Sequence, residues 1–368
     1  MELTNRERFV RLFRGQPVDR APFLQFMAAW PSSIERWKRE GLGSDPTRHT
    51  LWRTMGFDGL RGYFLPVKGF VWPEFEAQVL EEHGDVRLVR GRWGGTMRTQ
   101  RDEAFLPLTF DAAVHDRESW EAIKERLDPQ TPGRLPENWD QMCTEALASD
   151  EPIYTGDLPI GFFGGPRYLL SFERQAMLFY DDPALMHDIL DTLCHLWIEL
   201  YTRVQRAVPL DYFFIWEDMC YKGGPLISPG LFREFLLPRY QRLTSALKEA
   251  GVKLIFVDSD GDFRKLLPLW IEGGVDITFP WESQFGLDIL ESRRRYPALG
   301  MIGGVDKAAL IEGRTGADRA LEPVPAMLEA GRFIPAVDHE VPHDVSWDTY
   351  RYFCERLREM VWNHPPRA

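Results

Sequence analysis

VKLIFVDSDGDFRKLLPLWIEGGVDITFPWE, residues Val252–Glu282, contains two short apolar segments joined by a connection of helix length. Val252–Val257 ends at Asp258, and Val275–Trp281 ends at Glu282. An apolar run of this length that stops at a turn signal predicts a buried parallel strand. Acidic residues just past such strands gather at one face of a β/α fold. The stretch therefore predicts a strand–helix–strand unit with carboxylates at one of its faces.

The same alternation of apolar runs and helices continues along the second half of the chain. Helical segments such as Pro183–Val204 and Pro229–Ala250 separate further apolar runs, at Ile153–Thr155, Tyr212–Trp216, Asp276–Phe279, Met301–Ile302 and Phe333–Val337. Alternating strands and helices at this spacing predict parallel strands with right-handed crossovers. A (β/α)8 TIM-like barrel fits better than a doubly wound sheet, because the acidic residues fall at the ends of many different strands.

The first 150 residues of the sequence add elements before and within this barrel. Residues 4–14 predict an amphipathic helix with Thr4 as N-cap and Glu7 at the capping-box position, followed by a strand at about 22–27. Residues 57–110 are rich in aromatic, glycine and β-branched residues and predict an inserted β-hairpin. We therefore expect one domain over residues 1–368, a barrel with an N-terminal helical extension and a hairpin excursion.

Net charge and composition argue against several classes of function. The formal charge of -12 disfavours nucleic-acid binding and a basic membrane-docking face. No apolar run reaches the roughly 18–20 residues that cross a bilayer, and the N-terminal MELTNRERFVRLF lacks a signal-peptide core. The four cysteines have no CxxC spacing, so we expect reduced thiols rather than disulfides. A cytoplasmic protein is the expectation.

Acidic side chains follow nearly every predicted strand. They are Asp157, Glu217, Asp218, Asp258, Asp260, Glu282, Asp306 and Asp338, and His339 stands beside the last of them. In a barrel all of these residues ring one mouth, where carboxylates repel each other unless a cation binds or some stay protonated. Taken singly, each acid could also be the N-cap of the next helix. Their combination with a histidine at a strand end favours a functional site.

Several longer stretches resemble the uroporphyrinogen decarboxylase superfamily, which contains decarboxylases and cobamide-dependent methyltransferases that use zinc. Thr4–Pro22 is similar to the family's opening helix, Gly161–Pro183 and Glu217–Pro238 are similar to central segments, and Ile302–Leu310 and Ile334–Val345 to closing ones. The resemblance runs over essentially the whole chain. It implies the barrel fold, an enzyme and a homodimer.

The resemblance also implies a metal site. Zinc methyltransferases of the superfamily use a His-x-Cys pair after one strand, a Glu after the next and a Cys after the last. The matching positions here are Asp258 with Asp260, then Glu282, then His339. Zinc accepts carboxylate and imidazole ligands, and such a site could lower the pKa of a bound thiol, hydroxyl or water. We expect a divalent metal, zinc, at these four residues, and a corrinoid carried by a partner protein.

Further residues near the expected mouth complete the candidate site. The candidate proton donors and acceptors are Asp157, Glu217 and Tyr221. The candidates for an apolar substrate wall, with barrel core as the alternative, are Trp216, Trp281 and Phe162. Lys307 could hold an anionic group, but a pair with Asp306 is the favoured interpretation.

The segment after the first strand bears on the choice of reaction. Decarboxylases of the superfamily carry an arginine there that grips the carboxylates of the porphyrinogen, whereas Phe23–Ser33 (FLQFMAAWPSS) has none before Arg36. A carboxylate-rimmed substrate would thus meet an apolar and acidic mouth. The leading hypothesis is a metal-dependent methyltransferase that moves a methyl group between a small molecule and a corrinoid partner. The alternatives are a cofactor-free carboxy-lyase acting on a pyrrole or aromatic acid, and a non-catalytic small-molecule-binding barrel.

Overall fold

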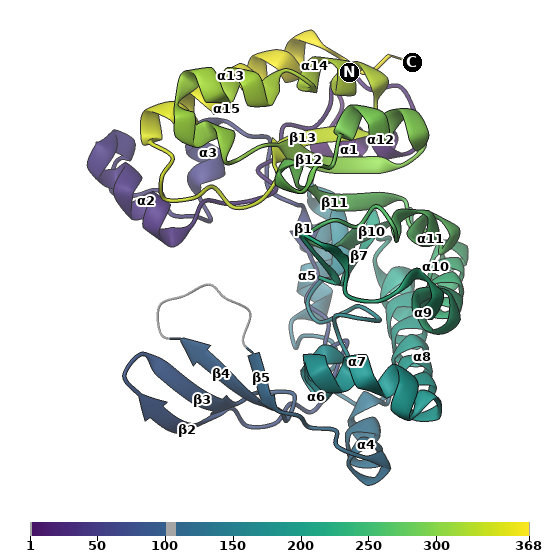
Figure 1. Ribbon diagram of the computed structural model, residues 1–368. Coiled ribbons are helices and arrows are strands. Elements are labelled where there is room, and N and C mark those ends of the chain that lie inside the picture. Colours follow the sequence, from purple (N-terminus) through teal and green to yellow (C-terminus); the bar gives the residue numbers. More distant parts are fainter. Residues whose placement is uncertain (1, 101–107, 368) are drawn as a thin grey trace.

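A sheet of seven parallel strands forms the centre of the computed structural model, which describes residues 2–100 and 108–367 (Figure 1). Its order is β1, β6, β7, β10, β11, β12, β13. The strands span Tyr63–Phe64 (β1), Ile153–Gly156 (β6), Tyr212–Trp216 (β7), Leu254–Asp258 (β10), Ile277–Trp281 (β11), Gly300–Val305 (β12) and Phe333–Val337 (β13). The predicted TIM-like α/β fold is confirmed, since the strands are parallel, curled and alternate with helices.

An N-terminal segment bridges both edges of this sheet. Leu24 pairs with Gly59, just before β1, and Ala29 pairs with Val341, just after β13. This segment was predicted as a strand at about 22–27, but it makes only an isolated parallel bridge on each side. Because the two bridges join the first and last strands, the sheet closes into a barrel and its edges are covered.

Helices cover the outside of the sheet. In Figure 1, α8, α10 and α11 lie on the side of β7 and β10, and α13, α14 and α15 lie over β12 and β13. The helices span Asn5–Phe13 (α1), Pro31–Trp37 (α2), Leu51–Met55 (α3), Arg117–Lys124 (α4), Trp139–Ala148 (α5), Arg167–Leu170 (α6), Phe172–Asp181 (α7), Pro183–Ala207 (α8), Pro229–Leu231 (α9), Leu237–Ala250 (α10), Leu267–Glu272 (α11), Ile289–Arg295 (α12), Arg314–Leu321 (α13), Val324–Ala330 (α14) and Trp347–Asn363 (α15). Among the described residues, none of these helices is both long and apolar enough to cross a membrane.

The predicted helix over Pro229–Ala250 is present over its full range, with a change of hydrogen-bond pattern near its start. The short helix α9 is followed by a π-helical turn at Phe232–Leu236, and α10 begins at Leu237. Pro238 lies at the first positions of α10. A proline has no N–H to donate to the preceding turn, so the regular hydrogen-bond pattern breaks there.

Aromatic rings fill the inside of the barrel. Tyr154 stacks on Tyr212 with 4.6 Å between ring centroids, and Phe214 lies 4.8 Å from Phe256. Phe26, from the N-terminal segment, is 5.8 Å from Phe256 and completes the cluster. All five side chains are buried. Aromatic side chains of this size bury large apolar areas, and here they form a solid floor beneath the carboxyl ends of the strands.

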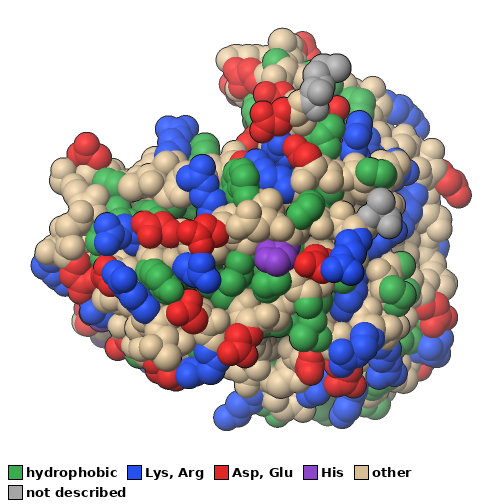
Figure 2. All heavy atoms as spheres, turned by 90° about the horizontal axis from the view of Figure 1, so that it is seen from above, with side chains coloured by type: hydrophobic (Ala, Val, Ile, Leu, Met, Phe, Trp, Pro, Cys, Tyr) green, Lys and Arg blue, Asp and Glu red, His purple; other side chains and the backbone are tan. Residues whose placement is uncertain are grey.

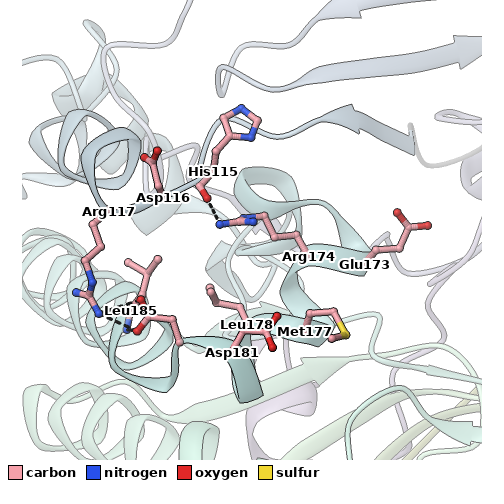
Figure 3. Close-up of a pocket in the computed structure, with 10 residues that line it drawn as sticks. His115, Asp116, Arg117, Glu173, Arg174, Met177, Leu178, Asp181 and Leu185 are labelled. Carbon is pink, nitrogen blue, oxygen red and sulfur yellow. Dashed lines mark hydrogen bonds and ion pairs between the residues drawn. The ribbon is translucent and has the colours of Figure 1, made fainter.

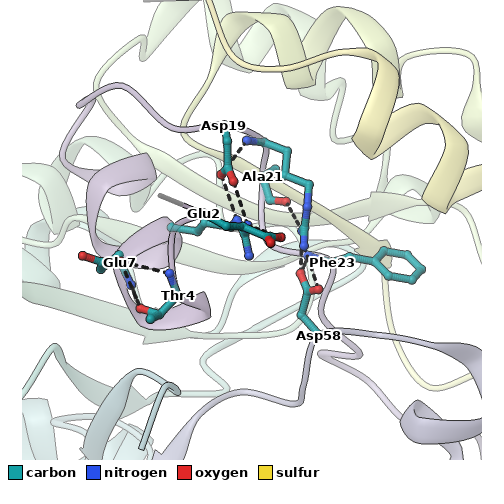
Figure 4. Close-up of polar contacts among 9 residues, drawn as sticks. Glu2, Thr4, Glu7, Asp19, Ala21, Phe23 and Asp58 are labelled. Atoms are coloured by element: carbon teal, nitrogen blue, oxygen red, sulfur yellow. Dashed lines mark hydrogen bonds and ion pairs between the residues drawn. The ribbon is translucent and has the colours of Figure 1, made fainter.

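Polar contacts fix the N-terminal segment (Figure 4). The predicted capping box is present, because Thr4 and Glu7 satisfy each other's backbone N–H groups. Arg20 binds Asp58 through two hydrogen bonds of 2.6 and 2.8 Å, and the same carboxylate accepts the N–H of Phe23 at 2.8 Å. A bidentate arginine–carboxylate pair is strong and directional. This pair therefore holds the N-terminal segment against the chain that leads into β1.

The inserted region is larger than the predicted hairpin. The expected pairing is present between β3 (Val86–Arg90) and β4 (Thr96–Gln100), but β2 (Gln78–His83) and β5 (Leu108–Asp111) extend it to a four-stranded antiparallel sheet. Residues 101–107 of the predicted hairpin region lie outside the described residues. The sequence of β2, QVLEEH, is exposed throughout, so it lacks the alternation of apolar and polar residues that would have predicted a strand.

Charges of both signs share the surface seen in Figure 2. Acidic and basic side chains are interspersed over this face, and no broad patch of one sign stands out there. The net charge of -12 is therefore not gathered into one acidic surface on this side of the molecule.

Glu151, next to the start of β6, gives the fold a testable pH dependence. Its carboxylate accepts a hydrogen bond of 2.6 Å from Asn5, whose own side-chain oxygen is buried without a partner. Burial raises the pKa of Glu151 to about 7. The unfolded chain, with its lower pKa, ionises first as pH rises, so this group lowers the stability of the fold progressively between about pH 4.5 and 7.

We predict that Glu151→Gln stabilises the protein at pH 8 by roughly 1–2 kcal/mol, after allowance for solvent screening, and changes little at pH 4.5. The amide cannot ionise, and its NH2 can donate to the unpaired oxygen of Asn5. Urea unfolding at the two pH values would measure the difference. Glu355→Gln, at an exposed position, should show no such pH dependence. An equal effect of Glu151→Gln at both pH values would contradict the prediction.

Candidate active site at the barrel mouth

The carboxyl ends of the parallel strands bring most of the predicted acids to one face. Asp258 ends β10 and lies in register with Trp216 at the end of β7. Asp157 and Asp218 follow β6 and β7 with φ of 74° and 40°. A positive φ is costly for residues other than glycine and is concentrated at functional sites. The two strained aspartates therefore mark the mouth as a constrained, candidate functional region.

An inner cluster of Arg61, Asp157 and Asp258 lies over the aromatic floor. The guanidinium of Arg61 is 5.9 Å from the ring centre of Phe26 and 5.6 Å from that of Phe214. Burial, and next the charge of Asp260, raise the pKa of Asp258 well above its usual value, although Arg61 acts in the opposite direction. A carboxyl group in such a place can stay protonated near neutral pH and donate a hydrogen bond.

An outer pocket of about 440 Å³ opens beside the inner cluster. Its lining includes Tyr221, Asp260, Glu282, Lys307 and His339. His339 Nε2 is 3.6 Å from an Asp260 carboxylate oxygen, and Lys307 Nζ is 3.6 Å from a Glu282 oxygen. Burial disfavours the charged imidazole, but the contact with Asp260 outweighs it and the pKa of His339 is raised. The outer pocket therefore presents a histidine that can hold a proton at neutral pH.

The expected pair of Lys307 with Asp306 is wrong. The side chain of Lys307 faces Glu282, while the carboxylate of Asp306 accepts the backbone N–H of Ala308 at 2.8 Å. Asp338 is fully buried and accepts the backbone N–H groups of Ser283 and Lys307. Burial raises the pKa of Asp338 to about 6. Asp338 thus supports the loop next to His339 rather than pairing with the imidazole.

The four predicted metal ligands do not converge. Asp260, Glu282 and His339 line the outer pocket, but Asp258 belongs to the inner cluster beside Arg61. The oxygens of Glu282 accept hydrogen bonds from the Gly261 N–H at 2.8 Å and from Gln284 at 2.9 Å. Across the described ranges, no group of three or more His, Cys, Asp or Glu is arranged to hold a metal ion. The residues as they lie therefore do not fit the expected four-ligand zinc site.

Glu217 occupies a structural position. Its carboxylate is fully buried and accepts the backbone N–H groups of Phe162, Phe163 and Gly164 at 2.7–3.0 Å, together with the hydroxyl of Tyr240. Burial raises its pKa, and these four donors act against that rise. With its oxygens occupied, Glu217 holds the loop after β6 in place, a role different from the proton transfer expected of it.

The predicted aromatic wall divides between core and surface. Trp281 is buried, and its indole N–H donates a hydrogen bond to the Thr278 hydroxyl. Phe162 is buried between Trp197 and Tyr240, with ring centroids 4.9 and 5.3 Å away. Both therefore belong to the core, which was the alternative interpretation. Trp216 stays partly accessible, and Tyr221 is 54% exposed at the rim of the outer pocket.

Two cations at the mouth had no counterpart in the sequence predictions. Arg61 precedes β1 and faces the inner cluster. Arg167 pairs with Asp218 at 2.9 Å and lies 5.2 Å above the ring of Trp216. Neither follows a strand, so a search of strand ends misses both. For Arg61, the available signal was a lone charge in the glycine- and aromatic-rich segment GLRGYF.

A second cavity, of about 660 Å³, lies between the start of α4 and α7 (Figure 3). Both arginines that line it already contact other protein groups. Arg117 pairs with Asp182 at 2.8 Å, and Arg174 donates to the carbonyl of His115. None of the predicted site residues lines this cavity, so the candidate site remains at the barrel mouth.

Glu217→Gln tests the structural assignment. The amide would turn an NH2 group toward buried N–H donors, so we expect a loss of roughly 2–4 kcal/mol in the free energy of unfolding. Glu173→Gln, at an exposed position of α7, should change stability little. Chemical denaturation of both variants would measure the effect. A Glu217→Gln protein with unchanged stability and lost activity would instead support the predicted catalytic role.

Comparison with known proteins identifies the family. Residues 150–360 match the family model described as uroporphyrinogen decarboxylase (URO-D). A uroporphyrinogen decarboxylase from Nocardia farcinica (strain IFM 10152) is 27% identical over 252 residues, which span 64% of this chain and only 65% of that relative. A methyltransferase from Methanosarcina mazei shares the fold, with a TM-score of 0.60 over 97% of this chain and 99% of that one at 16% identity. The family model matches more than half of this chain, and the chain therefore belongs to the uroporphyrinogen decarboxylase family.

Proposed function

We propose that this protein is a cofactor-independent carboxy-lyase that removes carbon dioxide from a small planar pyrrolic or aromatic acid. One observation carries the proposal. His339, oriented by Asp260, faces an open pocket that also holds the Lys307–Glu282 pair. A proton donor surrounded by carboxylates suits a reaction that adds a proton to an uncharged ring and passes through a cation.

The chemistry requires a proton at the carbon that loses its carboxylate. The imidazolium of His339 donates its proton to that ring carbon and becomes neutral, so the ring carries a positive charge. Asp260 and Glu282 stabilise this cation electrostatically, since both line the same pocket. The bond to the carboxylate then breaks, its electron pair returns to the ring, and carbon dioxide leaves. Atoms and charges balance without a further reactant.

The family membership supports a reaction of this class. The matching relative from Nocardia farcinica is named a uroporphyrinogen decarboxylase. The absence of an arginine from Phe23–Ser33 still disfavours a substrate as rich in carboxylates as a porphyrinogen. The outer pocket of about 440 Å³ falls within the size range of small-molecule sites, which also favours a smaller acid.

The proton donor can be tested with solvent deuterium. Wild-type protein incubated with pyrrole-2-carboxylate or pyrrole-2,5-dicarboxylate in D2O should release carbon dioxide and place deuterium at the vacated carbon. We expect His339→Gln to slow this release by about 100-fold or more, because a positioned general acid contributes on that scale. His195→Gln, at an exposed position of α8, is the matched control. Equal release by His339→Gln and wild type would refute the role of His339.

Metal-dependent methyl transfer to or from a corrinoid partner is the second candidate. It is favoured by the shared pocket of Asp260, Glu282 and His339 and by the fold shared with the Methanosarcina mazei methyltransferase. Because these residues do not form a three-ligand group as they lie, binding of zinc would require them to rearrange.

Metal content separates the two candidates. Elemental mass spectrometry of the purified protein should find no stoichiometric zinc if the carboxy-lyase proposal holds. About one zinc per chain in wild type, lost in His339→Ala, would be the result expected for a metal site. That outcome would overturn the carboxy-lyase proposal in favour of methyl transfer.

A further inference from the structure

We propose that Arg61 binds a second, non-reacting acidic group of the substrate, so that the ligand is a planar aromatic acid with two acidic groups on opposite sides of one ring. The proposal deepens the proposed function, because it takes the barrel mouth to be the substrate site. It concerns binding and not the chemical step.

The guanidinium of Arg61 has little to hold it in the protein. Its Nε makes a long hydrogen bond of 3.4 Å to the Phe26 carbonyl, and one terminal nitrogen lies 4.0 Å from the sulfur of Met27. It forms an ion pair with none of the described carboxylates, although Asp157 and Asp258 act on it electrostatically. Five N–H donors on this side chain are therefore largely available.

The more deeply buried arginines differ from Arg61 in this respect. Arg20 binds Asp58 with two hydrogen bonds of 2.6 and 2.8 Å. Arg134 donates to four backbone carbonyls, at 2.6–2.9 Å. Burying N–H donors that have no matched acceptor costs free energy. A partly accessible arginine in this state is therefore suited to bind a ligand.

The surroundings of Arg61 favour a flat anion. The guanidinium lies over the faces of Phe26 and Phe214, which leaves its edge to bind a carboxylate bidentately. Asp258 is the nearest competitor for that edge. Asp258 acts on Arg61 electrostatically but forms no ion pair with it, so the edge of the guanidinium stays open to a ligand carboxylate.

The separation between the inner cluster and the outer pocket limits the size of the ligand. Asp258 belongs to the inner cluster, and Asp260, two residues further along, contacts His339 in the outer pocket. Two residues of chain span at most about 7 Å when fully extended. A single six- or five-membered ring with acidic groups at opposite positions spans a similar distance. One group would reach Arg61 while the reacting carbon lies next to His339.

Calorimetric titration with terephthalate, a ring with two opposed carboxylates that is too electron-poor to react here, tests the proposal. We expect wild type to bind terephthalate roughly 10- to 100-fold more tightly than monomethyl terephthalate, which lacks one charge. Arg61→Met should bring the two ligands to nearly equal affinity. Arg61→Lys should keep part of the difference in affinity between the two ligands, because lysine retains the positive charge but lacks the planar pair of N–H donors. An unchanged preference in Arg61→Met would overturn the proposal.

Two controls keep this result separate from the proposed reaction. Arg233→Met removes an arginine that pairs with Glu272 on the surface and should keep the wild-type preference. His339→Gln retains Arg61 and should still bind terephthalate, although the carboxylate at the other end of the ring loses the imidazolium beside it. If terephthalate binding depends on Arg61 but no acid is decarboxylated, the anion site stands and the carboxy-lyase proposal fails. Circular dichroism of Arg61→Met and Arg61→Lys would verify that each variant is folded.

Discussion

Packing of aromatic rings inside the barrel is the constraint on which the rest of the molecule depends. Tyr154, Tyr212, Phe214 and Phe256 come from three neighbouring strands and interlock at centroid distances of 4.6–6.4 Å. Phe26 joins them from the N-terminal segment that closes the sheet. Rings of this size leave no room for a channel at their level. Polar chemistry is therefore confined to the strand ends above them.

Charge compensation is the second condition that the mouth satisfies. A ring of carboxylates at one place is unstable unless each has a partner or remains protonated. Glu217 and Asp338 are matched by backbone N–H groups, and Asp218 is matched by Arg167. Asp260 and Glu282 face His339 and Lys307 in the outer pocket. The acids thus separate into those that support loops and those that are open to a ligand.

Much of the fold could be predicted from local sequence. The apolar runs gave β7 and β13 with their observed bounds, and the capping box at Thr4 is where the pattern indicates it. These features depend on neighbouring residues alone, through periodicity and capping. The four-stranded insertion was underestimated because β2 is fully exposed. The helix expected over Pro229–Ala250 has the predicted bounds, but Pro238 leaves a π-helical turn at Phe232–Leu236 within it that the apolar pattern did not indicate.

The sequence also determined which residues end the strands, and hence that Asp258, Asp260, Glu282 and His339 share one end of the barrel. Only the tertiary structure decided which of them face each other: Asp258 turns toward Arg61 in the inner cluster, while the other three line the outer pocket. Arg61 lies about 200 residues before Asp258 in the chain, and no local pattern records that approach. Strand ends are set by short-range propensities, whereas contacts across a barrel depend on how the whole sheet curls and closes.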